Sequence, residues 1–356
     1  MKRLADIQYE LINELFLLMS THYERITYIV VHLTTKHIKM KPLHLIPTLF
    51  LSLQLMAQTT YTEYPASVSI DGSELHATIT LADSLQTMPI VIIIPGSGAT
   101  DRNCNAGLML HTNAYKMLAT QLAHNGISSL RFDKRGVGQS SAAMQSEGQL
   151  RFETYIHDVV QWIKLVKQDK RFSEVFIAGH SEGSLIGIMA AQESKVNGFI
   201  SIAGPGRRID DELKKQLKGK LPPALYDEAA ACFDTLRLGQ TLSSVNPLLL
   251  SLLRPSIQPY MISWMKYDPC LEIQKLTIPI LIIHGTTDIQ VEEANAKLLK
   301  KTAPTAELVV IENMNHVLKE APLDRQENMA TYTDGTLPLK KELIELCAEF
   351  IKQQIE

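Results

Sequence analysis

The chain has 356 residues, a formal net charge of −3 and 45% hydrophobic residues. This length accommodates one large α/β domain with an insertion, or two small domains. The slightly negative charge, without any basic cluster, argues against nucleic acid as a partner. The four cysteines show no C-x-x-C spacing, so the sequence indicates neither a zinc site nor a dense disulfide framework, and one or two disulfides stay open.

The amino-terminal part has the order of a secretory signal peptide. A basic stretch at Lys41 precedes an apolar run that ends at Met56, and Ala57 supplies a small residue at a cleavage point. The run is short for a membrane span. We therefore expect 40–57 to be a signal peptide, 1–39 to be an over-extended reading frame, and the mature protein to be periplasmic or secreted, with no stable membrane anchor. An authentic amino-terminal helix is the alternative, and the protein would then be cytoplasmic.

After the expected cleavage point, apolar and polar residues alternate on both sides of Asp71-Gly72, which predicts a β-hairpin. Short apolar runs then alternate with runs of helical spacing, as is typical of parallel strands that are buried on both faces and joined by right-handed helical crossovers. The expected strands lie at 89–94, 127–132, 175–177, 198–203, 278–284 and 307–311. The expected helices lie at 113–124, 152–166, 185–189, 291–301 and 339–355.

The alternation stops between residues 204 and 276. This stretch is rich in helix formers and is punctuated by prolines. A structureless loop of this length is uncommon inside a compact domain. We therefore expect a helical cap at 205–276, inserted into an α/β core that comprises 58–204 and 277–356.

The stretch Gly179-His180-Ser181-Glu182-Gly183 reads G-x-S-x-G. A buried strand is predicted before it and a helix after it, which is the context of a nucleophile elbow. The two glycines let strand and helix approach each other, and the sharp turn lifts the Ser181 hydroxyl to the carboxyl end of the sheet. Without that context the pentapeptide is common and could be a chance match.

A serine hydroxyl needs a base to become a nucleophile, and the base needs an orienting carboxylate. Asp288 follows the expected strand at 278–284, and His316 follows the last expected strand. The chain order Ser181, Asp288, His316 is the order found in α/β-hydrolases. An aspartate after a strand can instead be a turn former or a helix cap, and a loop histidine is often a solvated surface group. His180 flanks the nucleophile but should point away from it.

The negatively charged oxygen of an acyl-transfer intermediate needs two fixed hydrogen-bond donors. One is expected to be the backbone N–H of Glu182, directly after the nucleophile. The second is expected in the Gly-rich turn after the strand at 89–94, and we assign it to Ser97, with Gly98 as the alternative. These glycines can also serve only to make a tight turn, and no phosphate-binding pattern such as G-x-G-x-x-G is present.

Taken together, these motifs resemble those of bacterial α/β-hydrolases, and most closely the serine-aminopeptidase-like carboxylesterases. The resemblance spans about 66–356 and rests on the turn at 95–98, the run at 131–140, the G-x-S-x-G stretch and the loops of Asp288 and His316. It implies an α/β-hydrolase fold with a mostly parallel central sheet, helices on both faces and an inserted helical cap. It also implies that the serine, aspartate and histidine form a catalytic triad that uses no metal or organic cofactor.

The resemblance is incomplete at Pro95, which takes the place of a histidine in front of the Gly-rich turn. By the same resemblance, the loop after residue 131 is structural, and Asp133 and Arg135 are expected to form an ion pair near the site. A role of Asp101 or Arg102 in the pocket stays open.

The serine, histidine and aspartate of the expected triad favour a serine esterase. We expect it to hydrolyse a small-molecule ester with a short, medium or aromatic acyl group. An apolar stripe recurs at helical spacing in the expected cap. Such a stripe is more often core between the cap and the body, but it can also line the substrate pocket. The stripe consists of Ile257, Tyr260, Met261, Trp264 and Met265.

Two other functions stay open. A serine peptidase of the aminopeptidase type would need a cap carboxylate to hold the free amino terminus of its substrate, and Asp210, Asp211 or Glu212 could serve. A catalytically silent binding module on the same fold would normally have lost one member of the triad. The sequence indicates neither the natural ester nor the oligomeric state.

Overall fold

The computed structural model describes residues 61–70, 72–82, 87–144 and 146–355. The predicted signal peptide and the segment before it lie outside the described residues, so both stay predictions. Among the described residues, no helix is long and apolar enough to cross a membrane. All four cysteines are free thiols.

Within the described residues, eight strands form one sheet in the order β1-β2-β6-β3-β7-β8-β9-β10. β1 and β2 are the predicted hairpin, and β2 pairs antiparallel with β6. All neighbouring pairs from β6 to β10 are parallel, as the alternating pattern predicted. The strands of this sheet are β1 (Tyr61–Ile70), β2 (Ser73–Ala82), β3 (Met88–Ile94), β6 (Ser128–Phe132), β7 (Phe172–His180), β8 (Gly198–Ile202), β9 (Ile280–Gly285) and β10 (Glu307–Ile311).

A small hairpin of β4 (Asn105–Ala106) and β5 (Leu110–His111) was not predicted, because two-residue strands leave no periodic pattern. The α-helices are α3 (Ala114–His124), α4 (Phe152–Gln168), α5 (Glu182–Glu193), α6 (Ile209–Leu217), α7 (Pro223–Arg237), α8 (Leu250–Leu253), α9 (Gln258–Trp264), α10 (Pro269–Ile273), α11 (Ala294–Thr302), α12 (Arg325–Ala330) and α13 (Lys341–Gln353). Short 3-10 helices lie at η3 (Gly138–Ala143), η4 (Glu147–Gln149) and η5 (Pro247–Leu249).

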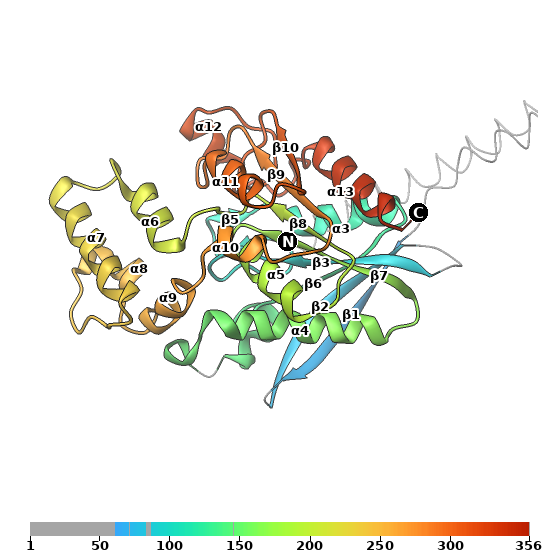
Figure 1. The fold of residues 1–356 in the computed structure, drawn as a ribbon, viewed down its shortest axis with the longest axis horizontal. Helices are drawn as coiled ribbons and strands as arrows, with labels where there is room; N and C mark the ends of the chain where they lie inside the picture. Colours follow the sequence, from blue (N-terminus) through green and yellow to red (C-terminus); the bar gives the residue numbers. More distant parts are fainter. Residues whose placement is uncertain (1–60, 71, 83–86, 145, 356) are drawn as a thin grey trace, which may run out of the picture. The chain divides into compact units, whose positions relative to one another are not determined.

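The central strands are buried on both faces. In β3, Ile90, Ile92 and Ile94 belong to one core cluster, whereas Val91 and Ile93 belong to the other, because successive side chains of a strand point to opposite faces. Buried residues of α4, α5 and α11 complete the first cluster, and those of α3 and α13 complete the second. Figure 1 shows these helices around the sheet, and the arrangement explains why the strands read as continuous apolar runs.

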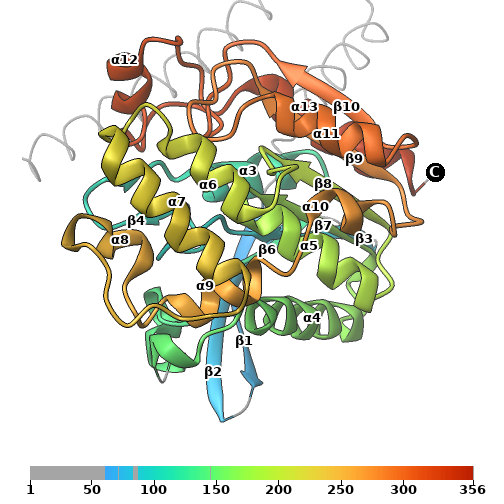
Figure 2. The same ribbon diagram turned by 60° about the vertical axis from the view of Figure 1, so that its left-hand side comes forward.

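The helical insertion, residues 205–276, carries α6 to α10 between β8 and β9. Figures 1 and 2 show α6 to α9 (yellow to orange) gathered beside one end of the sheet. Its buried residues, such as Phe233, Leu236 and Leu253, belong to the same core cluster as α4 and α5. The insertion therefore stabilises itself by packing on the core rather than by a separate core of its own.

Candidate active site

Ser181 lies at the junction of β7 and α5, as the sequence predicted. Its backbone has φ 55° and ψ −122°, a conformation that is strained for a residue with a side chain. The strain turns the chain sharply from the last residue of the strand into the first turn of the helix. As a result, the hydroxyl lies at the carboxyl end of the sheet, where open α/β sheets bind their ligands.

Two glycines make this junction sterically possible. A Cβ atom on Gly179 would lie 2.2 Å from the carbonyl oxygen of Gly183. A Cβ atom on Gly183 would lie 2.4 Å from the carbonyl oxygen of Ile94. Both positions are far inside van der Waals contact, so a larger residue would push α5 away from the sheet. The prediction that these glycines permit the close approach of strand and helix is confirmed.

His316 and Asp288 form a buried pair. Nδ1 of His316 lies 2.7 Å from Oδ2 of Asp288, and Oδ1 of Asp288 accepts hydrogen bonds from the backbone N–H groups of Gln290 and Val291 at 2.8 and 2.9 Å. Burial raises the pKa of Asp288. The charge and the hydrogen bond of His316 lower the same pKa by more, so it lies below its ordinary value. Asp288 is thus both the turn former that the sequence allowed and a carboxylate that orients His316.

The His316 loop lies beside the nucleophile elbow. The centroid of the His316 ring is 4.8 Å from that of His180, which directly precedes Ser181. The Ser181 hydroxyl forms no hydrogen bond with any other described residue, and it borders a cavity. Catalytic hydrogen bonds are often long without substrate and tighten in the complex. The proton transfer from Ser181 to His316 stays a prediction.

Two backbone amides beside Ser181 are available as donors. Hydrogen bonds among the described residues involve the N–H of neither Ser97 nor Glu182, and both residues line the same cavity as Ser181. Gly98, the alternative donor, also lines it. An oxyanion needs two such free N–H groups close to the nucleophile.

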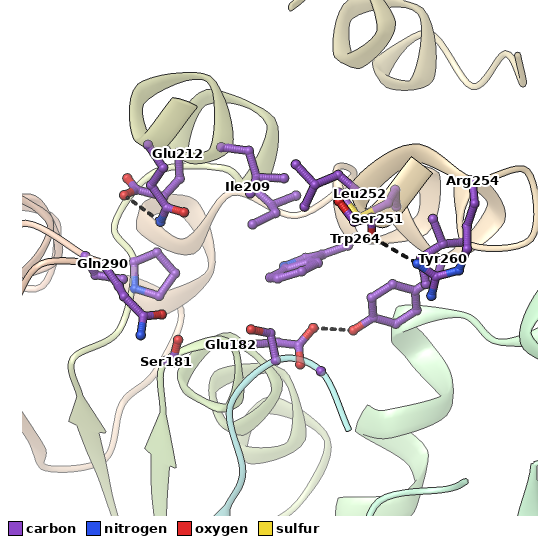
Figure 3. A pocket seen from close by; sticks show the side chains of 18 residues that line it. Ser181, Glu182, Ile209, Glu212, Ser251, Leu252, Arg254, Tyr260, Trp264 and Gln290 are labelled. Carbon is purple, nitrogen blue, oxygen red and sulfur yellow. Dashed lines mark hydrogen bonds between the residues drawn. The ribbon is translucent and has the colours of Figure 1, made fainter. Parts of the chain in front are cut away.

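A cavity of about 300 Å³ opens above Ser181 (Figure 3). Tyr260, Met261 and Trp264 line it, and all three are also packed in the core, so both interpretations of the apolar stripe hold for these residues. The prediction for Met265 was wrong. It lies beyond the last residue of α9 and is buried in the core cluster without lining the cavity.

A buried ion pair beneath this cavity was not predicted. The ammonium of Lys134 lies 3.3 Å from the carboxylate of Glu182, and their side chains are 2% and 3% exposed. Glu182 also accepts a hydrogen bond from the Tyr260 hydroxyl, which ties the helical insertion to the nucleophile elbow (Figure 3). Lys134 donates a further hydrogen bond to the carbonyl oxygen of Gly96, at 2.6 Å. The run after β6 contains this lysine, but sequence spacing does not show that it reaches the elbow.

The predicted ion pair between Asp133 and Arg135 is wrong. Asp133 pairs with Arg102 at 2.6 Å and also accepts the backbone N–H of Gln139. Because the oxygens of Asp133 are occupied in this way, Arg135 turns to α4 and binds both carboxylate oxygens of Asp158. The two residues therefore hold different parts of the core, and neither acts on the other.

The structure places the other charged residues that the sequence left open. Glu212 lines the cavity and forms an ion pair with Arg207 at 3.3 Å. Asp210 is buried and pairs with Arg208 and Arg237. Of the charged residues considered for the pocket or for holding a substrate's amino terminus, four do not line the cavity: Asp101, Arg102, Asp210 and Asp211.

His180 points away from the cavity, as predicted, and is only 5% exposed. Its Nε2 atom lies 2.9 Å from the carbonyl oxygen of His316, and its Nδ1 atom lies 2.7 Å from the hydroxyl of Tyr115. Burial, together with the charge of nearby His316, lowers the pKa of His180 from 6.5 to about 3, although the hydrogen bond to the His316 carbonyl raises the pKa. The imidazole of His180 is therefore neutral in the folded protein at ordinary pH.

Replacing His180 by glutamine should make the folded protein less sensitive to acid. The unfolded chain protonates His180 as the pH falls below 6.5, whereas the folded chain keeps it neutral down to about pH 3. The free energy of unfolding therefore falls as the pH falls between the two pKa values of His180, that of the unfolded and that of the folded chain. One proton lowers it by about 1 kcal/mol per pH unit in this range. His180→Gln lacks that proton site, so its free energy of unfolding should fall less steeply. Urea unfolding of both proteins across this pH range measures the two slopes, and equal slopes would contradict the buried neutral state of His180.

Comparisons with known proteins show which proteins this chain resembles. Residues 104–248 match the family model described as "Serine aminopeptidase, S33", and this region contains Ser181 but neither Asp288 nor His316. Esterase EstD of Thermotoga maritima is 26% identical over 288 residues, which cover 73% of this chain and 64% of that protein, so the chain spans less than two thirds of this relative. Monoglyceride lipase of Rattus norvegicus is 26% identical over 234 residues, which cover 60% of this chain and 74% of the lipase.

Solved structures show the same fold at low sequence identity. Est1E from Butyrivibrio proteoclasticus with bound ferulic acid has a TM-score of 0.53 at 19% identity, and the match covers 82% of this chain and 99% of that one. An esterase of Pyrococcus furiosus has a TM-score of 0.52 at 17% identity, with 83% and 91% covered. The fold and the family resemblance expected from the motifs are confirmed.

Proposed function

We propose that this α/β hydrolase cleaves carboxylic esters of small molecules through an acyl-enzyme intermediate on Ser181. One observation carries the proposal: a serine hydroxyl without a hydrogen-bond partner among the described residues borders a cavity, and the residue before this serine contacts a buried histidine that an aspartate orients. A base that is held in this way can activate an otherwise weak nucleophile. EstD and the similar protein of Pyrococcus furiosus are both named as esterases, which agrees with this chemistry.

In the proposed mechanism, Ser181 Oγ attacks the carbonyl carbon of the ester while His316 accepts its proton and Asp288 stabilises the resulting imidazolium. The carbonyl electrons move to the oxygen, which receives hydrogen bonds from the N–H groups of Ser97 and Glu182. Collapse of this intermediate expels the alcohol, which takes the proton from His316, and leaves the acyl group on Ser181. Water that His316 deprotonates then attacks the acyl ester and releases the carboxylic acid.

The cavity favours esters with a compact apolar acyl or alcohol part. Aliphatic and aromatic side chains of the helical insertion, among them Leu213, Leu252 and Trp264, form its wall opposite Ser181. A volume of about 300 Å³ is at the lower end for pockets that hold small organic ligands. We therefore expect short to medium aliphatic or single-ring aromatic acyl groups. The bound ferulic acid in the Est1E structure is an aromatic acid of this kind.

Hydrolysis of peptides from a free amino terminus is the second candidate, and one observation favours it. Glu212 places a carboxylate at the cavity wall, where it could hold an ammonium group. The matching family model is also described by an aminopeptidase. However, Arg207 already pairs with this carboxylate at 3.3 Å. An ammonium group would have to compete with that arginine, which makes the ester the better substrate.

Turnover of matched chromogenic substrates separates the two candidates. We expect hydrolysis of p-nitrophenyl butyrate and p-nitrophenyl benzoate, and no hydrolysis of an aminoacyl p-nitroanilide with a free amine, because the cavity offers no unpaired carboxylate for that amine. Hydrolysis of the anilide that stops when its amine is acetylated would establish the peptidase instead. Failure of all substrates, together with no reaction of the folded protein with a fluorophosphonate, would indicate a silent binding module.

A further inference from the structure

A buried tyrosine and a buried histidine connect the two loops that flank Ser181. The hydroxyl of Tyr115, on α3, accepts a hydrogen bond from the N–H of Gly96 at 3.0 Å. The same hydroxyl lies 2.7 Å from Nδ1 of His180, whose Nε2 lies 2.9 Å from the carbonyl oxygen of His316. Tyr115 and His180 are 1% and 5% exposed. We call this chain of hydrogen bonds, from Gly96 through Tyr115 and His180 to His316, the Tyr115–His180 bridge.

The partners fix the direction of every hydrogen bond in the bridge. A carbonyl oxygen can only accept, so Nε2 of His180 must carry the hydrogen that it donates to His316. In a neutral imidazole, Nδ1 is then an acceptor, and the Tyr115 hydroxyl must donate to it. The Tyr115 oxygen remains free to accept the Gly96 N–H. All four groups are satisfied by one tautomer, and the low pKa of His180 keeps that tautomer neutral.

One end of the bridge holds the peptide next to the proposed oxyanion donor. Gly96 is fixed on both sides, since its N–H bonds to Tyr115 and its carbonyl oxygen accepts from Lys134 at 2.6 Å. In a trans peptide, the Gly96 carbonyl and the Ser97 N–H point in opposite directions. Fixing Gly96 therefore also fixes where the Ser97 N–H points.

The other end of the bridge holds the proposed base. The ring of His316 is held by Asp288 through Nδ1, and its backbone carbonyl is held by His180. These two hydrogen bonds act on different parts of the residue, so together they restrict both the ring and the loop that carries it. Neither Tyr115 nor His180 lines the cavity above Ser181.

We propose that Tyr115 and His180 are positioning residues that set the distance between the oxyanion loop and the His316 loop. The proposal rests on the proposed ester hydrolysis and extends it to residues that touch neither substrate nor the reacting atoms. A change in this distance would misplace the base and the oxyanion donor relative to each other, and a shift of about 1 Å can cost about a hundredfold in rate. Because neither residue of the bridge lines the cavity, substrate binding should be affected little.

The experiment compares two variants of the bridge, of which the first removes one oxygen atom and keeps the ring packing. Tyr115→Phe deletes only the hydroxyl, whereas His180→Gln keeps an N–H that can reach the His316 carbonyl but loses the ring nitrogen Nδ1 that accepts from Tyr115. The matched control is Tyr267→Phe, which deletes a hydroxyl that donates to Glu153 at 3.0 Å and lies outside the cavity lining. Steady-state kinetics with p-nitrophenyl butyrate give kcat and KM for each variant, well below the lowest thermal midpoint of unfolding.

The bridge predicts a fall in kcat of about tenfold to a hundredfold in Tyr115→Phe, with KM changed by less than about threefold. Tyr267→Phe should keep both parameters. The two bridge variants act on one chain of hydrogen bonds, so the loss in the double variant should be smaller than the product of the single losses. An unchanged kcat in folded Tyr115→Phe overturns the proposal. If that variant does not fold, an unchanged kcat in His180→Gln overturns it equally.

Labelling by a fluorophosphonate separates this proposal from the proposed function. The reaction uses the nucleophile, the base and the oxyanion donors, but it needs no particular ester. If the wild-type protein hydrolyses no ester and yet is labelled, the ester assignment fails while the bridge is still tested by the labelling rate. Slower labelling of Tyr115→Phe than of Tyr267→Phe supports the bridge, and equal rates refute it.

Discussion

Replacing Ser181 by alanine should lower kcat for p-nitrophenyl butyrate by about 10⁵-fold or more, because the variant has no atom that can form the acyl-enzyme. The residual rate should come only from the free amides of Ser97 and Glu182 and from binding in the cavity. KM should change little, since a hydroxyl without a hydrogen-bond partner contributes little to binding. Alanine keeps the Cβ atom at this strained position, so the fold should be retained.

Ser184→Ala is the matched control for this variant. Ser184 lies one turn further along α5, where its hydroxyl bonds to that of Ser201 at 2.8 Å. Ser184 is buried, and it does not line the cavity. The control should lose some stability and keep its turnover. Ester hydrolysis that survives in Ser181→Ala at more than about a hundredth of the wild-type rate would remove Ser181 from the mechanism.

Replacing Asp288 by asparagine should lower kcat by about 10⁴-fold through the wrong tautomer of His316. Oδ1 of Asp288 accepts two backbone N–H groups, from Gln290 and Val291. The amide oxygen of the asparagine must therefore stay at that position, and its NH₂ group must face Nδ1 of His316. Nδ1 then has to accept, which leaves the hydrogen on Nε2, so the imidazole cannot take a proton from Ser181.

Asp324→Asn provides the control for the backbone role of this aspartate. Asp324 also accepts two backbone N–H groups, from Gln326 and Glu327 at 2.9 and 3.0 Å, and no histidine shares its carboxylate. Both variants should keep their fold, because an amide oxygen can replace the carboxylate oxygen as acceptor. Only Asp288→Asn should lose activity. Normal turnover in folded Asp288→Asn would show that another group orients the base.

The sheet and its helices could be predicted because their signals are local. The strand at 307–311 was predicted at its observed bounds, and the strand at 89–94 was predicted within one residue. Burial on both faces produces an apolar run that turn residues delimit, and this pattern survives without knowledge of the neighbours. The hairpin of β4 and β5 has too few residues for any pattern, and α12 shows no apolar stripe, because Asn328 is its single buried residue.

The members of the proposed triad could be predicted from chain order, since each follows a strand whose end reaches the same edge of the sheet. The residues that form hydrogen bonds with the loops around the triad could not be predicted in this way. Tyr115 lies on a helix, and Lys134 lies in a loop, 65 and 48 positions from the residues that they bind, His180 and Glu182. Contacts between such distant positions leave no spacing in one sequence, and they emerge only when the strands are ordered in space.

The wrong predictions have related causes. Asp133 and Arg135 have opposite charges and are close in sequence, but each finds a better partner across the fold, Arg102 and Asp158. Helical spacing groups Met265 with the residues of the apolar stripe, but this C-cap residue of α9 packs into the core cluster instead of lining the cavity. Proximity along the chain thus predicts side-chain contacts poorly where residues of several other elements lie within reach.

Peptide mapping after fluorophosphonate labelling tests the central claim most directly. The claim is that Ser181 is an activated nucleophile beside a base and two oxyanion donors. We predict one phosphonyl adduct per chain, on the peptide that contains Ser181, and its absence when His316 is replaced by alanine. A folded wild-type protein that carries no adduct, or that carries it on a different side chain, would contradict this account.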